Sequence, residues 1–246
     1  MDDPDSLWPF LPFLLGGVPV TLLVAALSMA LAIPTAFILA LGRSSKSPWL
    51  TIPSGFVIEL FRGSSSLVQL FWAFYVLPFF GIELPALAAG VLVLGLNSGS
   101  YLSEVVRAGL NAVPQGQHEA ALTLGFSAPY RFFRITLPQA LPLMIPPFGN
   151  ALVTMVKFTS LVSLVTIQDL TFRANLVGSS LGDSSYVYVI VIFAYFGINY
   201  LLGRAAWSLE RIVSRSAGVD ASSLVAGASS SGGQSRVPAW ALGVAR

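Results

Sequence analysis

Long runs of apolar residues, separated by short polar segments, follow one another along the chain. The first covers about 13–41 without a charged residue, and a helix needs about 20 apolar residues to cross a bilayer. Pro19 and Pro34 are expected to kink this span. Such kinks are tolerated in a membrane where neighbouring helices or hydroxyl groups satisfy the carbonyls that a proline frees. Three further runs cover about 84–106, 139–166 and 186–208. This pattern predicts an all-α integral membrane protein.

Two runs depart from a plain span. Between 55 and 78, Glu59, Arg62 and a glycine-serine cluster interrupt the apolar residues, so we expect an interfacial helix, a break and a second span from about Leu67. In the run at 139–166, prolines and Lys157 intervene. A continuous helix from 140 to Asp169 would be about 45 Å long, against a hydrocarbon core of about 30 Å. We therefore expect about five transmembrane helices, the fourth of them discontinuous or strongly tilted.

The charges predict the topology of these spans. Basic residues gather in loops on one side, which the positive-inside rule assigns to the cytoplasm, while the other side carries mostly acidic residues such as Glu83 and Asp183. Residues 1–10 are then an extracytoplasmic tail, and 11–212 form the transmembrane domain with a cytoplasmic loop at 107–138. Residues 213–246 are a cytoplasmic tail, rich in Ser, Gly and Ala and expected to be disordered. The basic residues of the cytoplasmic side are Arg43, Lys46, Arg107, Arg131, Arg134, Arg204, Arg211 and Arg215.

The composition argues against several classes of protein. Hydrophobic residues make up 55% of the chain and charged residues 10%, and the net charge of +2 is carried by a few loops, which disfavours a nucleic-acid surface. The chain has no cysteine and one histidine, His118, which excludes thiolate and Cys/His metal sites. The sequence shows no set of nucleophile and base residues gathered at membrane depth, which disfavours a membrane-embedded enzyme. A stand-alone secondary carrier is another alternative, although no internal repeat supports it.

The cytoplasmic loop contains a short segment bounded by helix breakers. Pro114 and Gly116 precede the triplet 119–121, and Gly125 follows it after three intervening residues. An exposed helix between two spans suits docking to a cytoplasmic partner. Its alanines allow close approach, Gly125 permits a backbone angle that other residues avoid, and Glu119 offers an ion pair. Pro138 is expected to start the return to the membrane.

In register, this segment resembles the EAA loop of type I ABC importer permeases, whose pattern is EAA, three residues, Gly, nine residues, then Ile-x-Leu-Pro. Every position matches, and the coupling residues are Glu119, Ala120, Ala121, Gly125, Ile135, Leu137 and Pro138. The resemblance covers about residues 16–210, and within this family the chain is similar to the polar amino acid permease branch. Two departures are Ser64-Ser65 in place of Thr-Pro, and Phe158 in place of an acidic residue. The runs 70–78 and 169–172 resemble ectoine and hydroxyectoine permeases.

The resemblance implies a mechanism and partners. Two permease chains, identical or paralogous, pair in the bacterial cytoplasmic membrane, and each presents its EAA helix to a cytoplasmic ATPase subunit. An extracytoplasmic solute-binding protein delivers a polar, zwitterionic solute. The chain has no Gly-x-x-x-x-Gly-Lys-[Ser/Thr] phosphate cradle, so we expect neither a cofactor nor catalysis in it. ATP and Mg²⁺ would be bound by the ATPase subunit, and the remaining partner is membrane lipid.

Ionisable residues at membrane depth cost about 2.5–3.5 kcal/mol each on insertion scales, so each is a candidate for function. Lys157 could contact a solute carboxylate or gate the path, or it could be a structural tie to a carbonyl or to Asp169. Arg62 could line a cavity at the serine-rich break or pair with Glu59. The small polar residues 97–101 could line a path or only join helices. Candidate pathway residues are Arg62, Asn97, Ser100, Tyr101, Lys157, Thr159 and Ser160.

Two further charged residues are expected to have a structural role. Glu104 and Arg107 lie three positions apart, near the cytoplasmic end of the third span. A structural ion pair that anchors the EAA loop is favoured there over a contact with solute. His118 is expected to be a solvated residue of the loop helix.

Overall fold

The computed structural model describes residues 8–181 and 185–216, and this part of the chain is helical, without strands. Four helical runs are long and apolar enough to cross a bilayer: Leu11–Arg43, Ala86–Asn111, Ala128–Val165 and Ser185–Val213. A bent pair of helices, Pro48–Gly63 and Ser66–Phe80, brings the number to as many as five. The prediction of an all-α membrane fold is therefore confirmed. Most of both predicted tails, and Asp183, lie outside the described residues.

The first run contains the 3-10 turn η1 (Trp8–Phe10), α1 (Leu11–Leu15) and α2 (Val18–Arg43). α2 continues through Pro34, while Pro19 lies in its first turn, where a backbone N–H has no intrahelical partner to lose. The interruption falls at Gly16 and Gly17 instead. A Cβ atom on Gly17 would lie 2.7 Å from the backbone of Leu170, so the absence of a side chain lets a distant segment approach.

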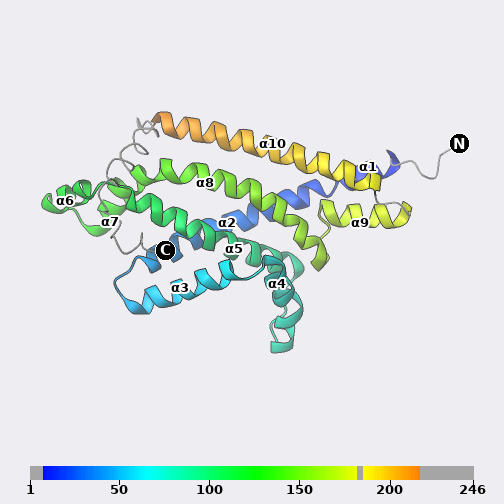
Figure 1. Cartoon of the computed structure of the whole chain (residues 1–246), viewed down its shortest axis with the longest axis horizontal. Helices are drawn as coiled ribbons and strands as arrows, with labels where there is room; N and C mark the ends of the chain where they lie inside the picture. Colours follow the sequence, from blue (N-terminus) through cyan, green and yellow to red (C-terminus); the bar gives the residue numbers. More distant parts are fainter. Residues whose placement is uncertain (1–7, 182–184, 217–246) are drawn as a thin grey trace, which may run out of the picture.

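The second predicted span has a different layout from the one expected. α3 (Pro48–Gly63) packs along α2 and α5, and after the break at Ser64 and Ser65 the chain bends by 106°. It continues as α4 (Ser66–Phe71), the π-helical η2 (Trp72–Val76) and the 3-10 helix η3 (Leu77–Phe80). This arm projects from the side of the bundle (Figure 1). The helix before the break thus lies along the bundle and the arm lies across it.

The rest of the chain comprises α5 (Ala86–Asn111), α6 (Gln115–Thr123), α7 (Ala128–Arg131), the π-helical η4 (Phe132–Thr136), α8 (Leu137–Phe158), the 3-10 helix η5 (Thr159–Val165), α9 (Leu170–Leu181) and α10 (Ser185–Ser216). α8 continues through its prolines, and its 22 residues span about 33 Å, close to the hydrocarbon thickness. The excess length expected of the fourth run is taken up by η5 and by a turn at Thr166, whose φ is 66°.

The helical run that contains the fourth predicted span begins before Pro138, with α7. Pro138 lies in the first turn of α8, directly after the π-helical η4, where the N–H of Leu137 donates to the carbonyl of Phe132. The same arrangement precedes Pro78, since the N–H of Leu77 donates to the carbonyl of Trp72. In both places a wider π turn precedes the proline, so the helical path continues into a residue that has no N–H of its own.

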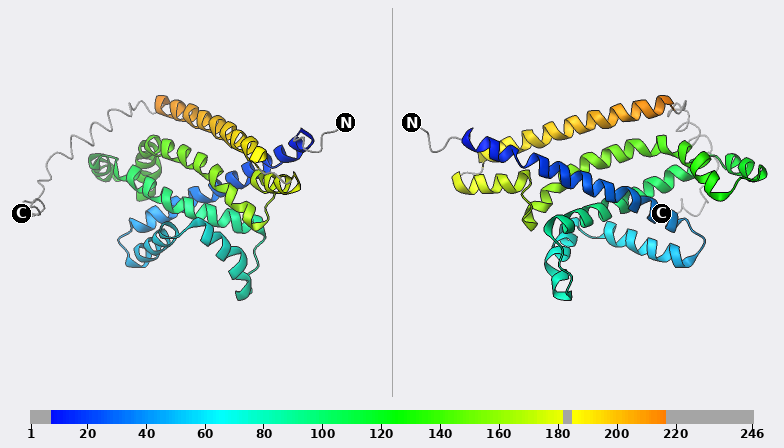
Figure 2. Two further views of the ribbon diagram at one scale, coloured as in Figure 1. Left: turned by 45° about the vertical axis from the view of Figure 1, so that its right-hand side comes forward. Right: turned by 180° about the vertical axis from the view of Figure 1, so that it is seen from behind.

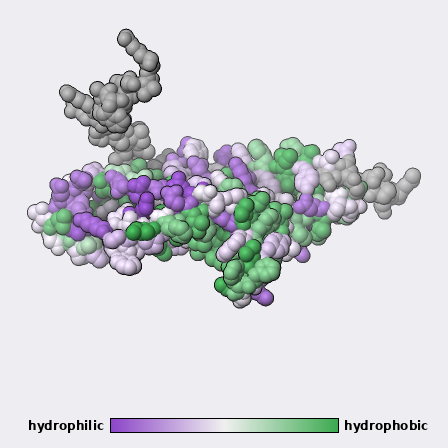
Figure 3. All heavy atoms as spheres, turned by 60° about the horizontal axis from the view of Figure 1, so that its bottom comes forward, coloured by the Kyte–Doolittle hydropathy of each residue, from purple (hydrophilic) through white to green (hydrophobic). Residues whose placement is uncertain are grey.

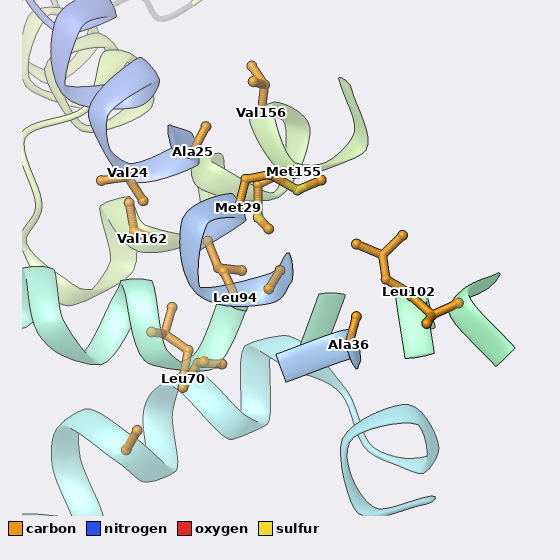
Figure 4. Packing of buried hydrophobic residues seen from close by; sticks show 14 of the residues in the cluster. Val24, Ala25, Met29, Ala36, Leu70, Leu94, Leu102, Met155, Val156 and Val162 are labelled. Atoms are coloured by element: carbon orange, nitrogen blue, oxygen red, sulfur yellow. The ribbon is translucent and has the colours of Figure 1, made fainter. Parts of the chain in front are cut away.

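The core is built around the closely packed pair α2 and α5. A Cβ atom on Gly95 would lie 2.8 Å from Leu31, and one on Gly99 would lie 2.8 Å from Thr35, so these glycines let the two backbones approach. Figure 4 shows side chains of α2, α4, α5 and α8 converging beside this pair. The labelled residues include Val24, Met29, Leu70, Leu94, Met155 and Val162.

Candidate functional site

The two ends of the molecule have different character. α6 and α7 lie at one end of the long axis, and α1 and α9 lie at the other (Figure 1; Figure 2). Figure 3 shows hydrophilic side chains gathered towards the α6 end and apolar side chains over the projecting arm. The loops that were predicted to be cytoplasmic therefore meet at one end of the bundle.

α6 is a short helix with a defined start and stop. Pro114 precedes it, and its end is closed by two hydrogen bonds, from the N–H of Gly125 to the carbonyl of Leu122 (2.9 Å) and from the N–H of Phe126 to the carbonyl of Ala121 (3.1 Å). This pair of bonds is a Schellman motif, which needs a left-handed residue after the helix. Gly125 supplies it with a φ of 74°. The segment is thus a rigid, closed turn at the tip of the molecule.

The exposed side chains of this segment are both polar and apolar. Glu119 and Ala120 are exposed, as are Leu122 and Leu124, the latter 70% exposed. Ala121 is different, because it is only 2% exposed within the chain itself. The idea that both alanines present a surface to a partner is corrected here: Ala120 is accessible and Ala121 packs inward.

The end of the coupling segment lies at the start of the next span. Ile135 and Leu137 are half-buried and Pro138 is exposed. Beside α6 lies a groove of about 530 Å³ that is lined by Glu119, His118, Leu122, Thr136 and the end of α5. A side chain from another protein could enter this groove and reach Glu119.

A second concave feature lies at the break between α3 and α4. An open cavity of about 640 Å³ is bordered by α5, by α8 and by the break. Its polar lining residues are Ser64, Ser65, Ser66, Asn97, Ser98, Tyr101, Asn150 and Thr154, and its apolar lining residues are Leu102, Val105, Pro147, Ala151 and Phe158. Hydroxyl and amide groups supply both donors and acceptors, and no charged side chain is among these described lining residues. We call this the central cavity.

Two amides hold the break open. Asn97 donates to the carbonyl of Phe61 (2.9 Å) and to Oε1 of Gln69 (3.2 Å). Gln69 in turn donates to the same carbonyl (3.0 Å) and to the hydroxyl of Ser64 (2.7 Å). A carbonyl in the last turn of a helix has no intrahelical donor, and the two side chains provide one. Asn97 therefore both borders the cavity and fixes its shape.

The candidate pathway residues do not all lie together. Tyr101 lines the central cavity, its hydroxyl donates to the carbonyl of Arg62 (3.4 Å), and the guanidinium of Arg62 lies 5.3 Å from the Tyr101 ring centroid. Ser100 is fully buried and donates to the carbonyl of Leu96. Thr159 is also fully buried and donates to the carbonyl of Val156. Ser100 and Thr159 are thus packed in the core, away from the central cavity.

Lys157 borders a different cavity. It is exposed, and with Ser160 it lines an open space of about 570 Å³ between α8 and α10. The α10 side of this space includes Tyr195 and Asn199, which the sequence did not single out. Within residues 8–181 and 185–216, the ion pair that forms is Arg107–Glu104, at 2.5 Å on the exposed end of α5, so Lys157 has no carboxylate partner there.

A buried polar cluster lies at the opposite end, around Asp169, which the sequence analysis considered only as a possible partner of Lys157. Asp169 is 0% exposed and accepts a hydrogen bond from the N–H of Phe172 (2.9 Å), which caps the start of α9. Its other oxygen lies 3.4 Å from the hydroxyl of Tyr195. Burial raises the pKa of Asp169 to about 6, and this residue lies in the turn between the last two membrane spans. The cluster joins α9 to α10.

Comparison with known proteins adds to this geometry. Residues 32–214 match the family model described as binding-protein-dependent transport system inner membrane component. The probable amino-acid ABC transporter permease protein y4tF of Sinorhizobium fredii is 41% identical over 205 residues, which are 81% of this chain and 86% of that protein. The L-cystine transport system permease protein TcyB of Bacillus subtilis is 35% identical over 212 residues, which are 86% of this chain and 89% of that protein.

Solved structures share the fold. The crystal structure of an amino acid ABC transporter with histidines has a TM-score of 0.77 at 30% identity, and the match covers 86% of this chain and 99% of that one. The MetNI methionine ABC transporter, solved in inward-facing conformations, has a TM-score of 0.68 at 21% identity over 83% of this chain and 98% of its own. The arrangement of helices around the central cavity therefore belongs to a known architecture.

Proposed function

Since the chain belongs to the family of binding-protein-dependent transport system inner membrane components, we propose that it carries a polar, zwitterionic, amino-acid-like solute inward, driven by ATP hydrolysis in a separate subunit. The resemblance to type I ABC importer permeases is confirmed. The chain is a non-catalytic, multi-pass subunit of the cell membrane. The N-terminus is proposed to face outside and the α6 end to face the cytoplasm.

One observation carries the proposed coupling role of α6. A short helix closed by a Schellman turn stands at the tip of the molecule with apolar side chains exposed, and a groove beside it leads to Glu119. Exposed leucines at a water-facing tip favour contact with another protein. We propose that an ATPase subunit covers this tip, that a second permease chain pairs with this one in the membrane, and that a solute-binding protein docks at the α9 end.

The central cavity is the proposed solute path. Its serine, asparagine and threonine side chains suit a solute that carries both charges, because such a solute needs donors and acceptors together. The ammonium of Lys157 in the neighbouring cavity remains the candidate contact for a solute carboxylate. Within this class, ectoine and hydroxyectoine are the first solutes to test, on the strength of the runs 70–78 and 169–172. Another polar amino acid is the alternative cargo.

The coupling role is tested with two glycines of the same loop. Gly125→Leu forces a side chain into a left-handed conformation, which costs about 1–2 kcal/mol and opens the Schellman turn. Gly116→Leu is the matched control, because a Cβ atom there has nothing within 4 Å. The permease is reconstituted with its ATPase subunits and binding protein, and uptake and ATP hydrolysis are measured together.

We expect Gly125→Leu to lower uptake per ATP hydrolysed at least tenfold, while Gly116→Leu keeps the ratio of the parent. Normal uptake by the Gly125 variant would count against the coupling role. Uptake by vesicles that contain no ATPase subunit would favour a secondary carrier instead. For the path, Thr154→Leu should reduce uptake while ATP hydrolysis persists, and Ser100→Ala, buried away from the cavity, should not.

A further inference from the structure

Five side chains form a continuous stripe from the middle of α10 towards its C-terminal end. Phe196, Tyr200, Arg204, Trp207 and Arg211 are separated by four, four, three and four residues. At about 100° per residue, these positions fall within an arc of about 80° on one face of the helix. All five are exposed. We call this face the aromatic-basic stripe.

Each arginine of the stripe rests on an aromatic ring one turn before it. Nη1 of Arg204 donates to the hydroxyl of Tyr200 (3.2 Å), and the guanidinium carbon of Arg211 lies 3.3 Å from the ring centroid of Trp207. Neither arginine is paired with a carboxylate in the part of the chain that the structure describes. The two guanidinium groups are therefore held in place, yet their charge is not neutralised.

Phe196 and Tyr200 border the open space between α8 and α10 that Lys157 also lines, whereas the other three residues of the stripe lie beyond it. α8 packs on a different face of α10, where a Cβ atom on Gly149 would lie 2.9 Å from Cβ of Ala206. α10 forms one edge of the molecule, with α3 on the opposite side of the bundle (Figure 1). In the single chain the side chains of this face are exposed.

The position of the stripe along α10 matches the bilayer boundary. Arg204 lies 19 residues after the start of the helix, which is about 28 Å at 1.5 Å per residue, and the hydrocarbon core is about 30 Å thick. Arg211 lies about 10 Å further, beyond the core. Trp207 stands between them, where tryptophan is enriched in membrane proteins. The aromatic part of the stripe thus lies against acyl chains and its two charges lie at headgroup depth.

We propose that the aromatic-basic stripe of α10 is a binding site for the headgroup of an anionic phospholipid. A guanidinium binds phosphate through two parallel hydrogen bonds, and the ring beneath it orders the long side chain before the lipid arrives. Phe196 and Tyr200 give the acyl chains an apolar surface next to the phosphate. The site requires only that α10 crosses the bilayer. Arg204 and Arg211 are not among the residues that line the space around Lys157, so a test on these two arginines is separate from the cargo and from the coupling role of α6.

The test compares lipids on the purified permease with its ATPase subunits. The complex is stripped of lipid in detergent and titrated with phosphatidylglycerol or phosphatidylcholine, and retained lipid is counted by native mass spectrometry. We expect the parent to retain phosphatidylglycerol preferentially. Arg204→Gln/Arg211→Gln should weaken its binding about fivefold per arginine, or about 25-fold together, whereas Arg204→Lys/Arg211→Lys should keep part of the affinity.

The matched control removes the same charge from the same end of the molecule. Arg43 and Lys46 lie at the turn between α2 and α3, across the bundle from α10, and Arg43→Gln/Lys46→Gln should leave the titration unchanged. Equal retention of both lipids by the parent would overturn the inference, as would an equal loss in the control variant. A photoreactive side chain placed at Ser208 should cross-link to lipid, and cross-links mainly to a permease chain or an ATPase subunit would also overturn it.

Discussion

Asp169 provides the most direct test of how the α9 end of the molecule is held together. Its carboxylate is fully buried, caps α9 and contacts Tyr195, while its neighbour Arg173 donates instead to the carbonyl of Phe13 (2.8 Å). The groups that face Asp169 from α9 and α10, namely Phe172 N–H, Thr171 and Tyr195, carry no positive charge. Burial therefore raises its pKa to about 6, from an ordinary value of 3.8.

The sign and size of the effect follow from this difference. Because the folded protein holds the proton more tightly than the unfolded chain, the stability from this group is complete below pH 3.8 and is lost as the pH rises through about 6. At 1.36 kcal/mol per pH unit, the difference corresponds to about 3 kcal/mol. At neutral pH the ionised carboxylate is thus a cost that its hydrogen bonds only partly offset.

Asp169→Asn removes the charge and keeps an oxygen that can accept from the N–H of Phe172, and asparagine is as good an N-cap as aspartate. We expect this variant to unfold at a higher temperature than the parent at pH 7.5. The gain is at most about 3 kcal/mol, or about 6–12 °C for a chain of this size. The difference in unfolding temperature between Asp169→Asn and the parent should disappear below pH 4. Thermal unfolding in detergent from pH 7.5 to below pH 4 measures this.

Two comparisons make the result decisive. Glu83→Gln removes an exposed carboxylate at the loop before α5 and should leave the pH profile of the parent unchanged. Asp169→Ala loses the cap as well as the charge, so its free energy of unfolding should fall below that of Asp169→Asn by about 1 kcal/mol. A lower midpoint for Asp169→Asn at pH 7.5, or a pH dependence that it shares with the parent, would refute this account of the buried carboxylate.

Three further variants probe the packing and the cavity. Gly99→Ala places a Cβ atom 2.8 Å from Thr35 and should destabilise the α2–α5 pair by about 1–3 kcal/mol in thermal unfolding; an unchanged midpoint would contradict the close packing. Gln69→Leu leaves the carbonyl of Phe61 with one donor fewer and should lower the free energy of unfolding by about 1–3 kcal/mol. Uptake should fall with it. Phe158→Glu adds a carboxylate to the central cavity and should change which amino acids compete for uptake; an unaltered competition profile would place the solute path elsewhere.

Much of the fold followed from the sequence because hydrophobic length is a strong signal. Apolar runs of 20 residues or more located the spans at α2, α5, α8 and α10, and the breakers around α6 located this short helix. The left-handed angle of Gly125 could also be anticipated, since a glycine after a short helix often takes that conformation. These features depend on residues close together in the chain.

Other features depend on contacts that no local pattern reports. Asn97 and Ser100 lie one turn apart on α5, yet Asn97 borders the cavity and Ser100 is buried, because the exact rotation of α5 against α2 decides between them. The 106° bend requires Gln69 and Asn97 to reach the same carbonyl from two helices. α9 was missed because its 12 residues are a weak signal between two long apolar runs, although Asp169 before it is a good N-cap.

The cavity and the coupling segment are connected by continuous helices. α5 borders the central cavity and ends at Asn111, four residues before α6 begins, and α8 borders the same cavity and follows directly from α7 and η4. Near the α6 end, a Cβ atom on Gly109 would lie 2.8 Å from Met144, so α5 and α8 are closely packed there. On the proposed coupling role, a displacement of α6 by an ATPase subunit would therefore move α5 and α8 together, while the break between α3 and α4 supplies the opposing wall. Coupling between ATP hydrolysis and the shape of the cavity then needs no pathway beyond these two helices.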